Sequence, residues 1–304
     1  MAVIKSLWLG SARKKLGGAV TYQLKGQQIV RKEAASVSNP RTTAQMDQRI
    51  RLANLVNFYR ANKSWMAKGA FENKEQRWSD YNAFVSTNLS SNRVFLTKSQ
   101  ASKGVAVAAP YKVTAGSLPE LQASENSGTM EVAIQASEAP TTLGALSQAI
   151  ISRYPGIQNG DQLSIIQYNS RVDTDGDELL YVSPSEIILN TESSELLTAV
   201  LPNWTFSTTT MSSPSGSDAV AFSICVSRSV GGKIKVSPSW VVVIDETYGS
   251  DYVGDTAMQN AINSYGGSSV NFLDNQTIGL SSVPEGNTGG GGASGPGDPG
   301  DVTP

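Results

Sequence analysis

Residues 218–245, DAVAFSICVSRSVGGKIKVSPSWVVVID, contain three short runs of alternating apolar and polar side chains, at 218–228, 232–236 and 239–245. Alternation of this kind in β-branched sequence predicts β-strands. Gly231 and Gly232 separate the first two runs and predict a tight hairpin between them. Cys225 lies within the first run, where it is expected to be a small buried apolar residue rather than a reactive thiol.

The pattern extends upstream of this stretch. Met130, Val132 and Ile134 alternate with polar neighbours, and further strands are predicted at 162–169, 179–182, 185–190 and 195–201. Many short strands joined by Gly, Pro, Asn and Ser turns are typical of an antiparallel β-sandwich. Residues 128–280 are therefore expected to form an antiparallel β-sandwich-like domain. It should also contain a short helix at 143–153 and a late helix with Asp255 as its N-cap.

Residues 42–104 favour helices instead of strands. Leu52, Leu55, Val56 and Tyr59 recur at helical spacing and predict a long helix over 43–68. A second helix is predicted from about Ser79 to Leu89. The segment is rich in aromatic residues, which are Phe58, Tyr59, Trp65, Phe71, Trp78, Tyr81 and Phe84. Their helical spacing indicates a helical core rather than a platform on which bases stack.

Two segments have weakly ordering compositions. Residues 105–127 contain Pro110 and Pro119 and are interpreted as a linker. Residues 281–304 are acidic, rich in Gly and Pro and without Lys or Arg, so a disordered tail is expected. The fold class that follows is α+β, with an extended N-terminal arm or hairpin, a small helical segment, a β-rich domain and this tail.

The first 41 residues are expected to form a basic extended arm. Runs at 19–24 and 27–31 read as strands, and Lys25 with Gly26 fits the turn between them. Residues 1–104 carry 18 Lys and Arg against 5 Asp and Glu, whereas residues 105–304 carry 6 against 21. A lone hairpin is marginal in water, and opposite charges attract, so this arm is expected to dock on a partner surface.

Several function classes are excluded or weakened by composition. The chain has no histidine and one cysteine, so the usual catalytic base, a disulfide within the chain and multi-Cys zinc sites are all missing. No enzyme activity, cofactor or membrane association is expected. A weak calcium candidate remains at Asp173, Asp175 and Asp177, although the glycine in this stretch falls at the wrong position for a calcium-binding loop, which favours an acidic turn.

Short motifs carry a resemblance to a known family. They are Leu16-Gly17-Gly18-Ala19-Val20, Asn39-Pro40-Arg41-Thr42, Ser79-Asp80-Tyr81-Asn82-Ala83-Phe84, Pro155-Gly156-Ile157-Gln158-Asn159-Gly160-Asp161 and Ala257-Met258. Over most of residues 9–272 the chain resembles a family of unknown function, catalogued as 6266, from Bacteroidota and their phages. The resemblance implies no established activity. Its frequent phage or prophage setting implies, by association, a structural role in a virion.

These observations lead to one functional expectation. The protein is expected to be a non-enzymatic virion structural or assembly protein, associated with the capsid, neck or tail, made in the host cytoplasm and homo-oligomeric. Its arm would dock on other virion proteins or copies of itself through Arg13, Lys14, Lys15, Tyr22, Lys25, Ile29, Val30, Arg31, Lys32 and Arg41. The alternative is nonspecific nucleic-acid binding in association with the phage genome. A bacterial surface module is a third, less favoured option.

Overall fold

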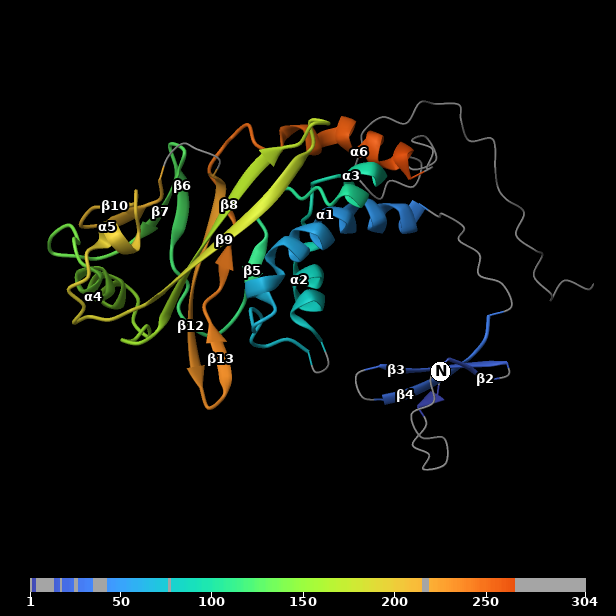
Figure 1. Cartoon of the computed structure of the whole chain (residues 1–304), viewed down its shortest axis with the longest axis horizontal. Helices are drawn as coiled ribbons and strands as arrows, with labels where there is room; N and C mark the ends of the chain where they lie inside the picture. The colour runs from blue at the N-terminus through green and yellow to red at the C-terminus, as the bar shows by residue number, and fades with distance from the viewer. Residues whose placement is uncertain are drawn as a thin grey trace, which may run out of the picture. The chain divides into compact units, whose positions relative to one another are not determined.

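The computed structural model describes residues 2–3, 14–16, 18–24, 27–34, 43–75, 78–214 and 219–265 (Figure 1). The chain divides into two compact units. One comprises Met1–Thr42 with Glu75–Arg77, and the other, called the body below, comprises Thr43–Lys74 with Trp78–Pro304. The expected mixture of helices and antiparallel sheets is confirmed. The predicted tail at 281–304 lies outside the described residues.

The amino-terminal unit contains a small antiparallel sheet, called the amino-terminal sheet below. Its strands follow the order β1 (Ala2–Val3), β4 (Gln27–Lys32), β3 (Ala19–Leu24) and β2 (Lys14–Leu16). Leu24 pairs with Gln27, so a two-residue connection joins β3 to β4 as the sequence predicts. The hairpin is therefore confirmed, and it is extended on both sides by a further short strand.

The centre of the body is a long antiparallel sheet in the order β13, β12, β8, β9, and β15 (Val242–Val243) also pairs with β12. The four main strands are β8 (Gln162–Val172), β9 (Glu178–Ile188), β12 (Ala219–Val230) and β13 (Lys233–Val236). The predicted hairpin at Gly231 and Gly232 is confirmed, because Val230 pairs with Lys233. The two strands predicted at 179–182 and 185–190 form the single strand β9.

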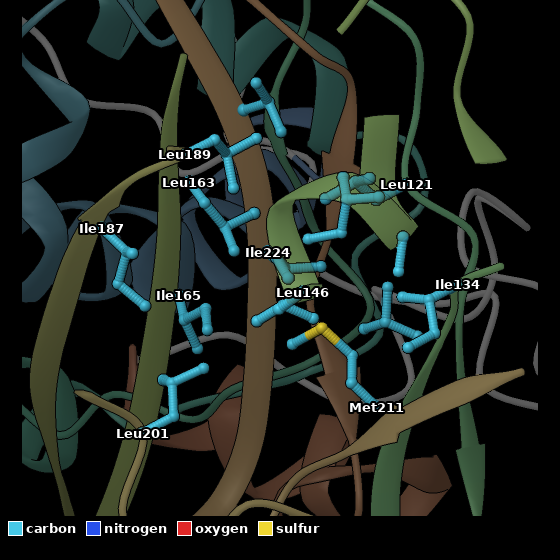
Figure 2. Close-up of a cluster of buried hydrophobic side chains, with 14 of the residues drawn as sticks. Leu121, Ile134, Leu146, Leu163, Ile165, Ile187, Leu189, Leu201, Met211 and Ile224 are labelled. Atoms are coloured by element: carbon cyan, nitrogen blue, oxygen red, sulfur yellow. The ribbon is translucent and has the colours of Figure 1, made fainter. Parts of the chain in front are cut away.

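One face of this sheet lies under a mixed layer. Helix α4 (Leu143–Arg153) confirms the predicted short helix, and beside it lies a sheet in the order β10 (Thr205–Phe206), β11 (Thr210–Ser212), β7 (Thr129–Ala133) and β6 (Ala123–Asn126). Figure 2 shows the buried cluster between these layers, in which Leu163, Ile165 and Ile224 from the long sheet meet Leu146 and Met211. Burial of such side chains is the main stabilising contribution to the body.

One predicted strand is wrong. Residues 197–200 form a helical turn, α5 (Leu197–Val200), rather than part of a strand at 195–201. Leu197 and Leu201 are four residues apart, and both are buried in the cluster of Figure 2. A helical turn places residues at this spacing on the same side, so packing overrides the strand tendency of the local sequence.

Helices cover part of the opposite face of the long sheet. Helix α1 (Thr43–Met66) and helix α2 (Asp80–Asn88, capped by Ser79) confirm the two helices predicted in this region. The centre of the Phe58 ring lies 5.8 Å from the ring centre of Phe84 in α2, 5.1 Å from that of Tyr111 and 5.6 Å from that of Tyr168 in β8. The aromatic residues are therefore core residues, as predicted, but this core joins the helices to the β-rich part in one unit.

The predicted linker at 105–127 is wrong. Val105, Val107, Val113 and Leu121 are buried, and the segment contains strands β5 (Lys112–Thr114) and β6. Strand β5 pairs with β14 (Ser239–Trp240), and helix α3 (Lys98–Lys103) precedes the segment. Composition misleads here because the segment has only short strands, and buried asparagine side chains of other elements bond part of its backbone.

Asparagine side chains supply many of those hydrogen bonds. The Asn54 amide accepts from the Val107 N–H at 2.8 Å and donates to the Val107 carbonyl at 2.9 Å. The Asn88 amide likewise accepts from the Lys112 N–H at 2.8 Å and donates to the Lys112 carbonyl at 2.9 Å. Asn57 donates to the carbonyls of Ala101 and Val105. A side-chain amide has the donor and acceptor that an extended backbone needs, so these residues attach the segment to α1 and α2.

The last described elements are the short helix η1 (Ser250–Tyr252) and helix α6 (Gly254–Ser264). Met258 and Ile262 of α6 pack against Met46 and Ile50 of α1. The predicted N-cap is wrong by two residues, because Val253 occupies that position and Asp255 lies in the first turn. No helix among the described residues is both long enough and apolar enough to cross a membrane.

Candidate functional site

The predicted docking residues lie in and around the amino-terminal sheet. Lys14 and Lys15 lie on β2, Tyr22 lies on β3, and Ile29, Val30, Arg31 and Lys32 lie on β4. Arg13, Lys25 and Arg41 lie outside the described residues, as does the Lys14 side chain. The structure thus brings strand residues from 14 to 32 into one small sheet.

The strand register divides these residues between the two faces of the sheet. Directly paired residues point to the same side of an antiparallel sheet. Tyr22 pairs with Ile29, and Val20 pairs with both Lys15 and Arg31. One face therefore carries Tyr22, Ile29 and Val20, together with the cations Lys15 and Arg31 that flank Val20. Alternation along β4 places Val30 and Lys32 on the other face, so the predicted docking residues do not form a single surface.

The amino-terminal sheet carries an excess of positive charge. Residues 1–42 contain 8 Lys and Arg against a single acidic residue, Glu33, whose carboxylate lies 2.7 Å from the Lys15 ammonium. The rest of the chain contains 16 Lys and Arg against 25 Asp and Glu. The net formal charges are +7 and −9, so the two parts of the chain are electrostatically complementary.

The acidic turn considered as a calcium candidate joins β8 to β9. Val172 pairs with Glu178, and the Asp173 carboxylate accepts the N–H groups of Asp175 and Asp177 at 2.8 and 2.9 Å. The Lys103 ammonium lies 2.7 Å from the Asp175 carboxylate and 2.8 Å from that of Asp177. Within the described part of the chain, no cluster of three or more His, Cys, Asp or Glu could hold a metal ion.

Charge pairing changes the titration of this turn. The hydrogen bond from Lys103 is the largest influence on Asp177 and lowers the pKa of its carboxyl, with a smaller contribution from the Gln100 amide. Burial raises the pKa of the neighbouring Glu178, and the carboxylates of Asp245 and Asp251 raise it further. Lys103 thus forms a partly exposed ion pair with two aspartates of this turn.

A hollow of about 160 Å³ opens on the helix-side face of the long sheet, near the carboxyl end of α1. Trp65 and Ile234 form part of its wall, and Ser164, Cys225 and Ser227 lie along the strands beneath. Cys225 is buried, as predicted, and burial raises the pKa of its thiol to about 12. A thiol with so high a pKa is a poor nucleophile at neutral pH.

Comparison with known proteins identifies the amino-terminal part of the chain. Residues 11–136 match the model of a family of unknown function, DUF6266. This likeness covers 126 of the 304 residues, which is less than half of the chain. The match covers most of the amino-terminal unit. In the body it runs to residue 136, three residues beyond the end of β7. The resemblance expected for residues 137–272 falls outside it.

The other two comparisons, with curated proteins and with solved structures, found no match.

Sequence reasoning did not find the hollow, because its lining comes from α1, from residues 68–70 that follow it, and from five separate strands, which are β5, β8, β9, β12 and β13. One signal was available. Gln162 and Ser164 alternate with Leu163 and Ile165 in β8, which indicates that only one face of this end of the strand is fully buried.

Proposed function

We propose that the protein is a non-enzymatic bacteriophage virion structural or assembly protein that docks on neighbouring subunits through its basic amino-terminal sheet. The main support for the proposal is the separate compact unit that residues 1–42 form with residues 75–77. Residues 1–42 have a net charge of +7, against −9 for the rest of the chain. The virion setting follows from the family resemblance alone. A capsid, a neck and a tail all remain suitable settings.

The construction of the amino-terminal sheet supports docking. It has four strands of two to six residues, and no helix or second sheet accompanies it among the described residues of its unit. Short strands of this kind need a further layer for independent stability. Ordering them costs about 1–2 kcal/mol per residue before contacts offset it. A neighbouring subunit would supply the missing burial, and complementary charge would favour a copy of the same chain.

A second function has one specific observation in its favour. Lys15, Arg31 and Lys32 are exposed and lie on both faces of the amino-terminal sheet, so they could neutralise phosphates of a nucleic acid. Such binding would be nonspecific, because phosphate contacts carry no sequence information. The strongly acidic body argues against it as the main role, since a polyanion would be repelled there.

Deletion of residues 1–41 tests the proposal. We expect analytical ultracentrifugation to show oligomers of the full chain and monomers of the deletion variant, with the circular dichroism and thermal unfolding of the body retained. A full chain that is monomeric at every concentration, or a deletion variant that still assembles, would overturn docking through this sheet. Binding of the full chain to a DNA duplex with a steep salt dependence, in the absence of oligomers, would support the alternative instead.

A further inference from the structure

One end of the long sheet has an uncovered face. Gln162 pairs with Ile188 on one side and Ser227 on the other, and Ser164 pairs likewise with Glu186 and Cys225. These residues therefore share the face that α1 and α2 cover further along the sheet. Here Ile188 is 55% exposed and Ile234 is 41% exposed, whereas Leu163 and Ile165 on the opposite face are buried. The sheet thus ends with an open, partly apolar surface.

The hollow of about 160 Å³ lies in this open surface. Helix α1 ends at Met66, and Gly69, which has a φ of 104°, lies beside Ile234 where the chain leaves the helix. Ser164, Cys225 and Ser227 are too small to fill the space that remains under Trp65. A depression with small residues beneath it and apolar residues at its edge is a place where a large side chain can insert.

The size and chemistry of the hollow favour an aromatic ring that carries a hydroxyl group. A cavity of roughly 150 Å³ accepts a benzene molecule, so the volume here suits one six-membered ring. The Ser164 and Ser227 hydroxyls and the Gln162 amide, all part of the lining, could satisfy the polar end of a phenol. Tyrosine therefore fits better than a purely aliphatic side chain.

The amino-terminal sheet offers such a side chain. Tyr22 is the sole aromatic residue on the described parts of strands β1 to β4, and it shares its face with Lys15 and Arg31. The exposed carboxylate of Glu186 lies at the hollow and could pair with one of these cations. The opposite net charges of residues 1–42 and of the rest of the chain favour a second copy as the source.

We propose that the hollow under Trp65 receives Tyr22 from the amino-terminal sheet of a second copy of the chain. This inference rests on the proposed function and names the place where the sheet docks. An inserted ring would be desolvated and enclosed on several sides, as binding hot spots are, while Glu186 at the edge would contribute to orientation.

The first experiment compares two variants of the full chain by sedimentation. Ser227→Leu fills the hollow and Tyr22→Ala removes the ring. We expect each to weaken association by at least about tenfold, and the double variant to be no weaker than either single variant, because both remove the same contact. Ser183→Leu is the matched control, since Ser183 is exposed on β9 and does not line the hollow. It should leave association unchanged.

The second experiment uses Cys225, the single cysteine of the chain, as a reporter inside the hollow. Its reaction with N-ethylmaleimide is followed at alkaline pH in dilute and in assembled protein. We expect the reaction to slow severalfold on assembly of the wild-type chain and to keep its dilute rate in Tyr22→Ala. This readout remains valid if Ser227→Leu proves poorly folded. A rate that does not change on assembly would overturn the inference.

The two proposals fail differently. If deletion of residues 1–41 abolishes oligomers while Tyr22→Ala and Ser227→Leu assemble normally, the amino-terminal sheet docks elsewhere and the hollow is not its acceptor. If the deletion variant assembles like the full chain, docking through this sheet is itself overturned, and the inference falls with it.

Discussion

Buried asparagines explain how residues 92–113 become part of the body. Asn54 and Asn92 meet at the Tyr111 hydroxyl, which accepts from the Asn54 side-chain nitrogen at 2.7 Å and donates to the Asn92 side-chain oxygen at 2.6 Å. Asn54 also bonds both polar groups of Val107. Buried amides of this kind fix one arrangement of the chain, because any other would leave donors or acceptors unpaired.

The substitution Asn54→Leu tests this role, since it keeps the approximate shape and removes every hydrogen bond of the amide. It leaves the N–H and C=O of Val107 without their side-chain partners, so we expect a loss of about 2–4 kcal/mol in the free energy of unfolding. Urea unfolding followed by circular dichroism measures it. Asn260→Leu is the control, because Asn260 is exposed on α6, and its midpoint should hardly move. Equal midpoints for the two variants would contradict this role.

The ion pair of Lys103 makes a prediction about acid stability. The pKa of Asp177 is lowered in the folded state, chiefly by the Lys103 hydrogen bond, so its stabilising contribution is present above the ordinary carboxyl range near pH 4 and is lost as the pH falls below it. We expect Lys103→Met to flatten the fall in stability below about pH 4. Acid titration of urea midpoints measures the effect.

Lys98→Met is the matched control for Lys103→Met, since Lys98 lies exposed on the same short helix. It should keep the wild-type acid profile. Identical profiles for the wild-type chain and Lys103→Met would show that the ion pair makes no net contribution, which is a common finding for exposed pairs.

Among the helices and strands, α1 is the one that connects the parts of the body. Phe58 on this helix contacts α2 through Phe84, the 92–113 segment through Tyr111 and β8 through Tyr168. The carboxyl-terminal half of α1 therefore packs on the long sheet, and α1 in turn covers part of one face of that sheet. The helical part and the β-rich part should unfold together, as one cooperative unit.

Phe58→Ala tests this cooperativity. Removal of a fully buried aromatic ring costs about 3–5 kcal/mol, and we expect helix and sheet signals to shift together. Far-ultraviolet circular dichroism and the hydrogen exchange of β8 report the two parts. Tyr181→Ala, at a half-exposed position on β9, should cost much less. Loss of helix signal without loss of β8 protection would mean that the helical segment is a separate domain after all.

Local signals in the sequence predicted the elements well. The hairpins at 25–26 and 231–232 and the helices α1, α2 and α4 each follow from spacing, caps or turn residues within about a dozen positions. The wrong predictions concern segments whose structure depends on tertiary contacts. Residues 105–127 look like a linker because contacts that hold them come from distant helices, as when the Asn54 and Asn88 amides bond Val107 and Lys112. Residues 197–200 turn into a helix because two leucines reach a core built elsewhere.

The candidate sites also divide into features set by local sequence and features set by tertiary contacts. The position of the basic hairpin could be predicted from residues 14–32 alone, but the division of its side chains between two faces required the register with β2. The hollow could not be predicted, because it depends on where α1 ends above a sheet whose strands are far apart in sequence.

For the chain as a whole, charge is the most consequential property. Residues 1–42, with a net charge of +7, lie in one compact unit, and all but residues 75–77 of the remainder, with −9, lie in the other. Opposite charges of this kind favour contact between copies. A small sheet that is stabilised mainly by a neighbour should be weakly protected in a lone chain and well protected in an assembly. Protection of the amino-terminal sheet should then depend on protein concentration, whereas protection of the body should not.

Hydrogen exchange of β3 and β4, measured by mass spectrometry across a dilution series, decides whether the amino-terminal sheet depends on a neighbour. We predict that their amides exchange at least about tenfold more slowly in concentrated than in dilute protein, in step with the oligomer population, while β8 stays equally protected throughout. If β3 and β4 are fully protected in a chain that is monomeric by sedimentation, the amino-terminal sheet needs no neighbour and the proposed docking is wrong.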